Sequence, residues 1–248
     1  MPVSRIFAPL SLQPDTQISL TGEQARYISK VLRLRPGDNV TAFDGRGGEF
    51  AASIASIGRS KVVLNITQHL DIDVESPLHI HLLQCVSRGE RMDFVVQKTT
   101  EMGVRRITPV LSQFSVVKLD KDRAEKRRQH WEKVASSACE QCGRNSLPQI
   151  DLPVALQNWF GDNLDTQAKP GSRLLLAPGA SEKLSSVELS GATVIILIGP
   201  EGGFSDAEYE QAAAAGFRNI GFGPRILRTE TAAIATVTAL QSLFGDLL

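Results

Sequence analysis

The sequence is poor in cysteine and contains no long apolar run. Three of its 248 residues are cysteines, and the longest apolar stretch, near residues 194–198, is far too short to span a membrane. The segment after Met1 lacks the apolar core of a secretory signal peptide. An odd number of cysteines without such a signal argues for free thiols in a reducing compartment. We therefore expect a cytoplasmic protein with no membrane contact.

Metal and nucleotide-binding motifs are also scarce. Cys139 and Cys142 form a single C-x-x-C pair whose nearest histidine, His130, stands alone, and a structural metal needs more ligands. The glycine-rich segment 199–203 is not followed by G-K-[ST], and it does not read G-x-G-x-x-G. The sequence thus gives no support to a metal site, an NTPase phosphate-binding loop or a nicotinamide site.

The formal net charge is zero, but the charges are unevenly distributed. Residues 81–150 hold 13 lysines and arginines against 8 acidic residues, whereas residues 151–248 hold 6 against 11. A solvated helix of mixed charge at 120–133 accounts for part of this asymmetry. A basic middle beside an acidic end is typical of a polyanion-binding surface next to a separate small-molecule site.

Residues 1–72 are predicted to be rich in β-structure. One helix is expected to begin at Thr21, where Thr21 and Gln24 have the spacing of a capping box, and to end before Pro36. Short strands joined by glycine-bearing turns are typical of a small barrel. The expected strands are Ser4–Ala8, Gln17–Leu20, Asn39–Asp44, Glu49–Ile57 and Lys61–Gln68.

Residues 73–248 show a different pattern, after an acidic break that ends in proline at 70–77. Strands alternate with helices, which predicts a parallel sheet with helical crossovers. The expected strands are 79–86, 106–111, 172–177, 194–198 and 218–222, and the expected helices are 90–102, 120–142, 154–160, 205–215 and 229–244.

Two of these helices carry more detailed signals. Ser205 and Glu208 have the spacing of a capping box, and Gly216 suits the position after the same helix ends. The last helix has an apolar stripe on one face, which by periodicity alone would pack on its own sheet. The stripe consists of Ala233, Val237, Leu240 and Phe244.

Two loops in the last third of the chain are predicted to form one ligand site. Residues 196–205 read ILIGPEGGFS, residues 221–232 read GFGPRILRTETA, and each follows an apolar run and leads into a helix. Ligands of α/β domains bind at the carboxyl ends of parallel strands, where glycines let them approach the backbone. The first loop alone is equally well explained as a plain strand-to-helix turn. The second loop favours the site, because it places apolar residues between glycine and arginine.

These two segments resemble the ribosomal RNA small subunit methyltransferase E family, within the SPOUT class of S-adenosylmethionine-dependent RNA methyltransferases. The resemblance continues in RGERMDFVVQKTTEMGV, SACEQCGRNSLPQI, SRIF and VLRLRPGD, so it spans nearly the whole chain. It implies a PUA-like, RNA-binding β-barrel in residues 1–72. For residues 73–248 it implies an α/β SPOUT domain with a C-terminal trefoil knot, which forms a homodimer through helices such as the last. General topology rules would not predict a knot.

The resemblance also implies an S-adenosylmethionine site in a deep cleft between the knotted loops. A third loop, after the strand expected at 172–177, would complete the pocket, and methyl transfer from a sulfonium needs no metal. The residues implied in cofactor contact are Leu176, Ala177, Ile198, Gly199, Glu201, Gly203, Gly223, Ile226, Leu227 and Arg228.

Members of this family methylate N3 of a uridine in 16S ribosomal RNA. Because uridine N3–H is a weak acid, the reaction needs a proton acceptor and stabilisation of charge on the uracil oxygens. Arg225 and Arg228 suit the second task, since guanidinium groups stay charged and donate in a rigid fork. Glu230 and Glu201 are the nearest carboxylates. Either could accept the proton, or Glu230 could stabilise its helix N-terminus and Glu201 its own loop.

The ribosomal RNA is expected to be positioned through its phosphates, with the target nucleotide taken out of its stack or met in an accessible strand. A solvated surface and an RNA contact are about equally good interpretations of the arginines in VLRLRPGD. The RNA-binding candidates are Arg5, Arg33, Arg35, Arg88, Arg91, Lys98 and Arg144.

Two other functions stay open at this point. A non-catalytic RNA-binding or ribosome-assembly factor would use the same barrel and basic patch without cofactor affinity, and the intact GPEGG and GPRILR loops argue against it. A SPOUT enzyme that methylates a ribose 2′-hydroxyl of transfer RNA is the other. The N-terminal barrel and the CEQCGRN segment suit the ribosomal uridine family better.

Overall fold

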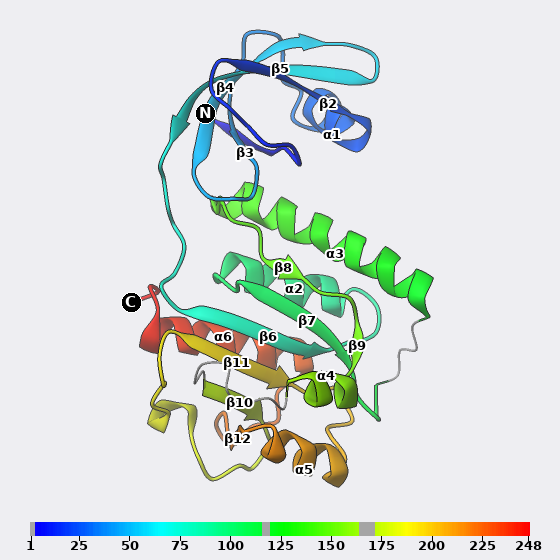
Figure 1. Ribbon diagram of the computed structural model, residues 1–248, viewed down its shortest axis with the longest axis vertical. Coiled ribbons are helices and arrows are strands. Elements are labelled where there is room, and N and C mark those ends of the chain that lie inside the picture. Colours follow the sequence, from blue (N-terminus) through cyan, green and yellow to red (C-terminus); the bar gives the residue numbers. More distant parts are fainter. Residues whose placement is uncertain (1–2, 116–119, 164–171) are drawn as a thin grey trace. The chain divides into compact units, whose positions relative to one another are not determined.

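The computed structural model describes residues 3–115, 120–163 and 172–248, and the chain divides into two compact units (Figure 1). The first unit combines Met1–Glu75 with Ser136–Leu147, and the second combines Ser76–Ala135 with Pro148–Leu248. The sequence pattern places residues 136–147 in the second domain. They join the first unit because Ser146 forms β-bridges with Gly45 and Arg46, contacts that no local pattern reveals.

The first unit contains a five-stranded sheet in the order β1-β3-β4-β5-β2. β1 pairs with β3 in parallel and the other pairs are antiparallel. Alternate residues of β5, such as Val62, Leu64 and Ile66, are buried in its core, as expected for a sheet with one covered face. The strand predictions are confirmed to within two residues at each end. The strands are β1 Ser4–Phe7, β2 Thr16–Thr21, β3 Asn39–Phe43, β4 Glu49–Ile57 and β5 Lys61–Leu70.

The helical segment of this unit differs from its prediction. Helix α1 covers only Gly22–Arg26 and continues as a π-helical turn, Tyr27–Val31. The capping box predicted at its start is wrong, because Thr21 makes no side-chain capping bond. Gln24 instead donates from Nε2 to the backbone oxygen of Phe7, 2.8 Å away on β1. The Gln24 side chain, which the local pattern assigned to the helix cap, therefore bonds to an acceptor on another strand instead.

The second unit contains a seven-stranded sheet in which every pair is parallel, as predicted. Its order is β12-β10-β11-β6-β7-β8, and β9 also pairs with β7. The two-residue strand β8 is too short for the sequence pattern to predict, and the helix predicted over 154–160 begins two residues too early, because Val154–Ala155 form β9 and the helix covers Leu156–Asp162. The strands are β6 His79–Cys85, β7 Arg106–Leu111, β8 Gln149–Ile150, β9 Val154–Ala155, β10 Ser172–Leu176, β11 Thr193–Ile198 and β12 Phe217–Ile220.

Helices cover both faces of this sheet (Figure 1). Leu82 belongs to a core with apolar residues of α2, α3 and α6, whereas its neighbour Leu83 belongs to a second core with residues of α4 and α5. Both faces are therefore buried, which explains the near-continuous apolar runs of the central strands. The helices are α2 Arg91–Glu101, α3 Lys121–Cys142, α4 Leu156–Asp162, α5 Asp206–Ala214 and α6 Thr229–Phe244, with a short 3-10 turn at Leu184–Ser186.

The signals predicted for α5 and α6 have clear outcomes. Ser205 and Glu208 form the reciprocal capping box, and Gly216 follows the end of α5 with φ +80°, so both predictions are confirmed. The stripe on α6 packs into the core of its own unit, where Val237 and Leu240 are fully buried. In the part of the chain that the structure describes, no helix is both long and apolar enough to cross a bilayer.

Candidate active site

A cavity of about 300 Å³ lies at the carboxyl ends of β10 and β11 in the second unit. The loops after β10 and β11 and the loop before α6 surround it. Every residue that the resemblance implies in cofactor contact lines this cavity, so the structure brings the predicted set together; contact with a cofactor stays a prediction. The lining residues are Leu176, Ala177, Pro178, Ile198, Gly199, Pro200, Glu201, Gly203, Phe204, Tyr209, Phe222, Gly223, Arg225, Ile226, Leu227, Arg228, Thr229 and Ala232.

Glycines shape the loop after β11 in two different ways. A Cβ atom on Gly199 would lie 2.9 Å from the ring of Phe204, so the ring can pack on the backbone only if this residue is glycine. Gly203 has φ +71°, a left-handed conformation that other residues rarely adopt. A Cβ atom on Gly203 would meet open space, so a side chain there would occupy the room that the bare backbone leaves.

Aromatic side chains complete the wall of the cavity, and sequence reasoning missed them. Phe204 and Tyr209 pack edge to face with ring centroids 5.7 Å apart. Burial raises the pKa of Tyr209, so its hydroxyl stays neutral and can donate or accept a hydrogen bond. Tyr209 lies one turn after the Ser205 cap of α5, and this helical spacing is the signal that could have placed it beside the loop.

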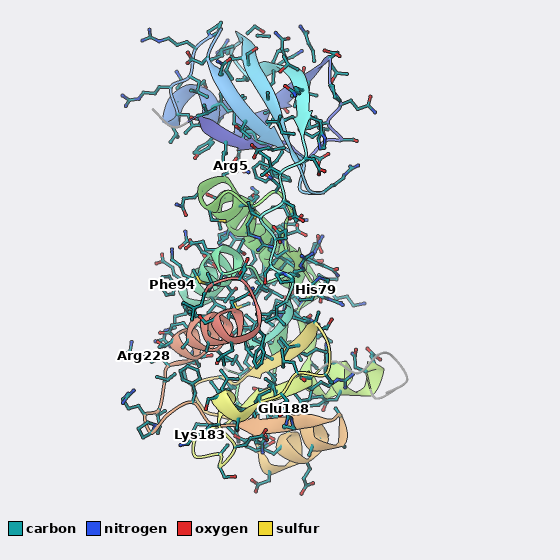
Figure 2. The ribbon with its side chains drawn as sticks, turned by 90° about the vertical axis from the view of Figure 1, so that its left-hand side faces the viewer. Arg5, His79, Phe94, Lys183, Glu188 and Arg228 are labelled. Carbon is teal, nitrogen blue, oxygen red and sulfur yellow. The ribbon has the colours of Figure 1, made fainter. Side chains whose placement is uncertain are left out.

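The charged residues at the cavity fall into a paired and an unpaired group. Glu201 forms an ion pair with Arg91, at the start of α2. Arg225 and Arg228 are exposed, line the cavity, and have no ion pair within residues 3–115, 120–163 and 172–248. Figure 2 labels Arg228. Glu230, in the first turn of α6, does not line the cavity. Its Oε2 atom is buried and has no hydrogen-bond partner among the described residues.

The RNA-binding candidates of the first unit separate into exposed and buried arginines. Arg33 and Arg35 are exposed. Arg144 is only 4% exposed and donates from Nη2 to Glu75 Oε2 at 2.6 Å. Arg5 is partly buried, pairs with Glu49 and also donates to Asn145 Oδ1. For Arg5 and Arg144 the phosphate contact stays a prediction, although Arg144 pairs with Glu75 and the two terminal nitrogens of Arg5 donate to acceptors inside the unit.

The candidates of the second unit have different partners. Arg88 is exposed, on the loop between β6 and α2. Arg91 pairs with Glu201 at the cavity, and Lys98 pairs with Glu101 at 2.8 Å within α2. Of these three candidates, Arg91 is the one that contacts a residue lining the cavity, among the contacts of the described residues.

A second cavity, of about 510 Å³, lies at the amino ends of the same sheet. Thr108 donates its hydroxyl proton to Asp151, so the hydroxyl oxygen must accept from His81 Nε2, 2.7 Å away. Arg106 donates from Nε to the same carboxylate at 2.7 Å. Burial, and then the nearby Arg106 charge, lower the pKa of His81 to about 4, so its ring is neutral at pH 7. The polar groups here satisfy one another.

Comparison with known families gives the class of the protein. The family described as RNA methyltransferase domain matches residues 74–241, and the family described as RNA methyltransferase PUA domain matches residues 20–67. The two matches correspond to the parallel sheet with its cavity and to most of the five-stranded sheet. The fold and the matches thus define an RNA methyltransferase domain preceded by a PUA domain.

Individual relatives narrow this class. The chain is 38% identical to ribosomal RNA small subunit methyltransferase E of Buchnera aphidicola, over 99% of this chain and 98% of that protein. It is 31% identical to the Bacillus subtilis protein of the same name, over 96% of each. The crystal structure of the Neisseria gonorrhoeae protein of this name, bound to S-adenosylmethionine, has a TM-score of 0.90 at 35% identity and covers 99% of this chain and 100% of that one.

A methyltransferase from Legionella pneumophila, solved in complex with the cofactor S-adenosylmethionine, has a TM-score of 0.93 at 39% identity. The match covers 100% of both chains. The protein described here therefore belongs to the ribosomal RNA small subunit methyltransferase E family.

Proposed function

We propose that this chain transfers the methyl group of S-adenosylmethionine to N3 of a specific uridine in 16S ribosomal RNA, giving 3-methyluridine. The observation that carries the proposal is the cavity at the carboxyl ends of the strands, in a chain whose relatives were crystallised with this cofactor. Its residues suit the group, because Leu176, Ile198 and Leu227 offer apolar walls and Gly203 leaves open space. Its volume of about 300 Å³ lies at the lower end of the range for small-ligand sites.

The arginines of the cavity are assigned to the charge that develops during the reaction. The bound cofactor supplies an electrophilic methyl group on a sulfonium. Arg225 and Arg228 are free of ion pairs in the described residues, so their guanidinium groups are available to donate to the uracil oxygens.

We propose Glu230 as the proton acceptor although it does not line the cavity itself, because it directly follows Thr229, which does. Its buried Oε2 atom has no partner within the described chain, whereas Glu201 is held by Arg91. An acceptor must be able to receive the N3 proton without first breaking another bond. Glu201 is instead assigned to holding its loop against the start of α2.

Division of labour between the two parts of the chain is a further element of the proposal. Residues 1–72 would supply RNA affinity through Arg33 and Arg35, which are exposed. Residues 73–248 would hold the cofactor and contribute Arg88 and Arg91 beside the cavity. Phosphates contacted by these groups would position the RNA, while the cavity acts on a base taken out of its stack.

Two finer features of the fold are proposed from the family resemblance. The five strands of the first unit would close into a PUA-like barrel, and the C-terminal segment of the second would thread into a SPOUT trefoil knot. In support, the loop after β11 and the loop before α6 line one cavity, although α5 and β12 separate them along the chain. A knot would hold these loops together without relying on side-chain contacts alone.

A homodimer formed through α6 and its neighbour α2 is also proposed. Val237 and Leu240 are buried in their own core, so they cannot form the interface, and substituting them would test folding only. The outer surface offers Phe94 on α2, 47% exposed, and Leu243 on α6, 52% exposed, and the two helices pack against each other (Figure 2). Changing both to glutamate should give monomers by light scattering. Leu152→Glu, at a similarly exposed leucine elsewhere, should not, and a wild-type chain that is a fully active monomer would contradict the dimer.

Mapping the modified nucleotide tests the proposed reaction. A methyl group on N3 blocks the pairing edge of uridine, so reverse transcriptase stops at it. In a strain without the gene, one such stop in 16S ribosomal RNA should disappear, and the wild-type gene should restore it, whereas Arg228→Ala should not. The proposal would be refuted if every stop seen in the wild-type strain persisted in the deletion strain, or if the deletion strain lacked a ribose methyl group instead.

A further inference from the structure

A buried chain of hydrogen bonds joins the two main loops of the candidate active site. Gln84 near the end of β6 is fully buried, and its Nε2 atom donates to Thr229 Oγ1 at 2.9 Å and to the backbone oxygen of Cys85 at 3.1 Å. Thr229, the first residue of α6, donates in turn to the backbone oxygen of Gly199 at 2.7 Å. The chain therefore links β6, the start of α6 and the loop after β11.

The direction of each bond follows from the groups involved. A carbonyl can only accept, so the single hydroxyl proton of Thr229 goes to Gly199. The Thr229 oxygen must then accept from Gln84, and the side-chain amide must present its NH₂ group to both of its partners. If the amide were flipped, its oxygen would face two acceptors. Only a side chain with two donor hydrogens on one atom can donate to both Thr229 and the Cys85 carbonyl.

The arrangement leaves one atom of Gln84 unsatisfied. Its Oε1 atom is buried and has no hydrogen-bond partner in the described part of the chain. A buried acceptor without a partner lowers stability, and a half-satisfied polar group is often worse for folding than an apolar one of the same size. Stability alone therefore gives little reason for glutamine here.

The Gly199 peptide is held from two sides. Thr229 holds its carbonyl oxygen, and the Phe204 ring packs where a Cβ atom would lie, at 2.9 Å. We infer that Gln84 is a positioning residue for the cofactor. Acting through Thr229, it fixes the position of the Gly199 carbonyl group and, with it, the distance between the loop after β11 and the start of α6. The inference rests on the proposed function for the identity of the ligand that these loops hold.

A second glutamine provides a matched control. Gln241, near the other end of α6, is also fully buried. Its Oε1 atom accepts from Ser76 Oγ at 2.7 Å, and its Nε2 atom donates to the backbone oxygen of Met102 at 3.0 Å. Gln241 resembles Gln84 in residue type and burial. Its hydrogen-bond partners in the described part of the chain, Ser76 and Met102, do not line the cavity, whereas Thr229 does.

Two measurements on Gln84→Met and Gln241→Met test the inference. In the protein without cofactor, hydrogen exchange of the amides in 199–204 should be about tenfold faster for Gln84→Met than for wild type. Calorimetry should show its dissociation constant for S-adenosylmethionine raised by about tenfold. Gln241→Met should change either quantity by less than about twofold, whatever its melting temperature. Equal effects of the two substitutions on both quantities would overturn the inference.

Thr229 gives an independent test that does not need Gln84→Met to fold. Thr229→Val keeps the shape and removes the hydroxyl, and it should weaken cofactor binding by about tenfold, whereas Thr229→Ser should weaken it by less than about threefold. Equal losses for both would contradict the inference. Failure of the wild-type protein to bind S-adenosylmethionine would refute the proposed function instead, and the exchange rates without cofactor would still decide the role of Gln84.

Discussion

The second unit has a cavity at each end of the same parallel sheet, and the larger one is not the candidate active site. At the amino ends, about 510 Å³ is bordered by Arg106, which pairs with Asp151, and by Arg173, which donates to the backbone oxygens of Asn163 and Ala215. At the carboxyl ends, about 300 Å³ is bordered by glycine backbone, apolar walls and the guanidinium groups of Arg225 and Arg228, which form no ion pair among the described residues. The availability of groups for a ligand distinguishes the two cavities better than their volumes do.

The two ends also differ in how the chain is built. The carboxyl ends lead into loops, where positions such as Gly203 can expose backbone. At the amino ends, His81, Arg106 and Thr108 belong to the strands themselves, so the sheet fixes their side chains and they can form lasting pairs with Asp151. We therefore expect changes at the carboxyl ends to alter binding and catalysis, and changes at the amino ends to alter stability.

The largest effect is expected for Arg228→Ala. Removing one preorganised donor to a developing negative charge typically lowers a rate by roughly 100- to 1,000-fold, and methyl transfer should fall by that factor. RNA affinity should change little. Arg218→Ala is the matched control, since Arg218 is an exposed arginine paired with Glu182 at 2.9 Å. Single-turnover methylation rates are measured for both variants. An equal loss of rate in the two would show that Arg228 has no special role in methyl transfer.

At the other cavity, acid should destabilise the fold through His81. Its pKa is about 4 in the folded chain, below the 6.5 of an unperturbed histidine, so the unfolded chain binds the proton first as pH falls. The stability is complete above about pH 6.5 and is lost between there and about pH 4, amounting to about 3 kcal/mol. Denaturant unfolding of wild type and His81→Gln measures this difference.

The exposed His79 on the same strand provides the control for that experiment. His79→Gln should keep the acid sensitivity of the wild type. His81→Gln should reduce it while leaving methyl transfer at pH 7 within about twofold of wild type, because the residue lies at the opposite end of the strands. An unchanged pH profile for His81→Gln would show that the buried ring does not titrate as described.

Gly203→Val tests the exposed backbone of the active-site loop. A branched side chain would occupy the open space beside the backbone, and the dissociation constant for S-adenosylmethionine should rise by at least about tenfold. Gly216 has a similar φ of +80° and also faces open space, so Gly216→Val imposes the same backbone strain away from the cavity. Calorimetry of both folded variants separates the effect of backbone strain from that of a side chain blocking the cofactor. A normal affinity of Gly203→Val for S-adenosylmethionine would contradict the assignment of Gly203 to the cofactor site.

The smallest effect is expected in the first unit, for Arg33→Ala with Arg35→Ala. RNA binding should weaken, and the slope of log affinity against log salt should fall by about 0.7 to 0.9 for each phosphate that the variant no longer neutralises. Cofactor binding should not change. Arg59→Ala with Lys61→Ala removes two other exposed cations of the same unit as a control. An unchanged salt slope for the Arg33 and Arg35 variant would place RNA affinity elsewhere.

Sequence reasoning succeeded where the determining contacts are local. The capping box of Ser205 and Glu208 joins residues three apart, and the strand and helix periods are equally local. The same rule failed for Gln24, because its partner, the Phe7 carbonyl, lies on another strand. A resemblance to known motifs placed the cofactor loops, which periodicity alone could not have paired.

Long-range partners explain most of what the sequence could not give. Arg144 is 69 residues away in the sequence from Glu75, the carboxylate with which it pairs. The sequence motif around Arg144 alone therefore could not distinguish a structural ion pair from an RNA contact. Gln84 and Thr229 are 145 residues apart. No sequence pattern connects these two residues, and only the folded chain places them side by side.

Transfer of an isotopic label tests the central claim most directly. The protein is incubated with small ribosomal subunits from the deletion strain and S-adenosylmethionine that carries a ¹³C methyl group, and the digested RNA is examined by mass spectrometry. We expect label in 3-methyluridine with the wild-type protein and almost none with Arg228→Ala. Label in a ribose-methylated or a carbon-methylated nucleoside, or equal labelling by the variant, would contradict it.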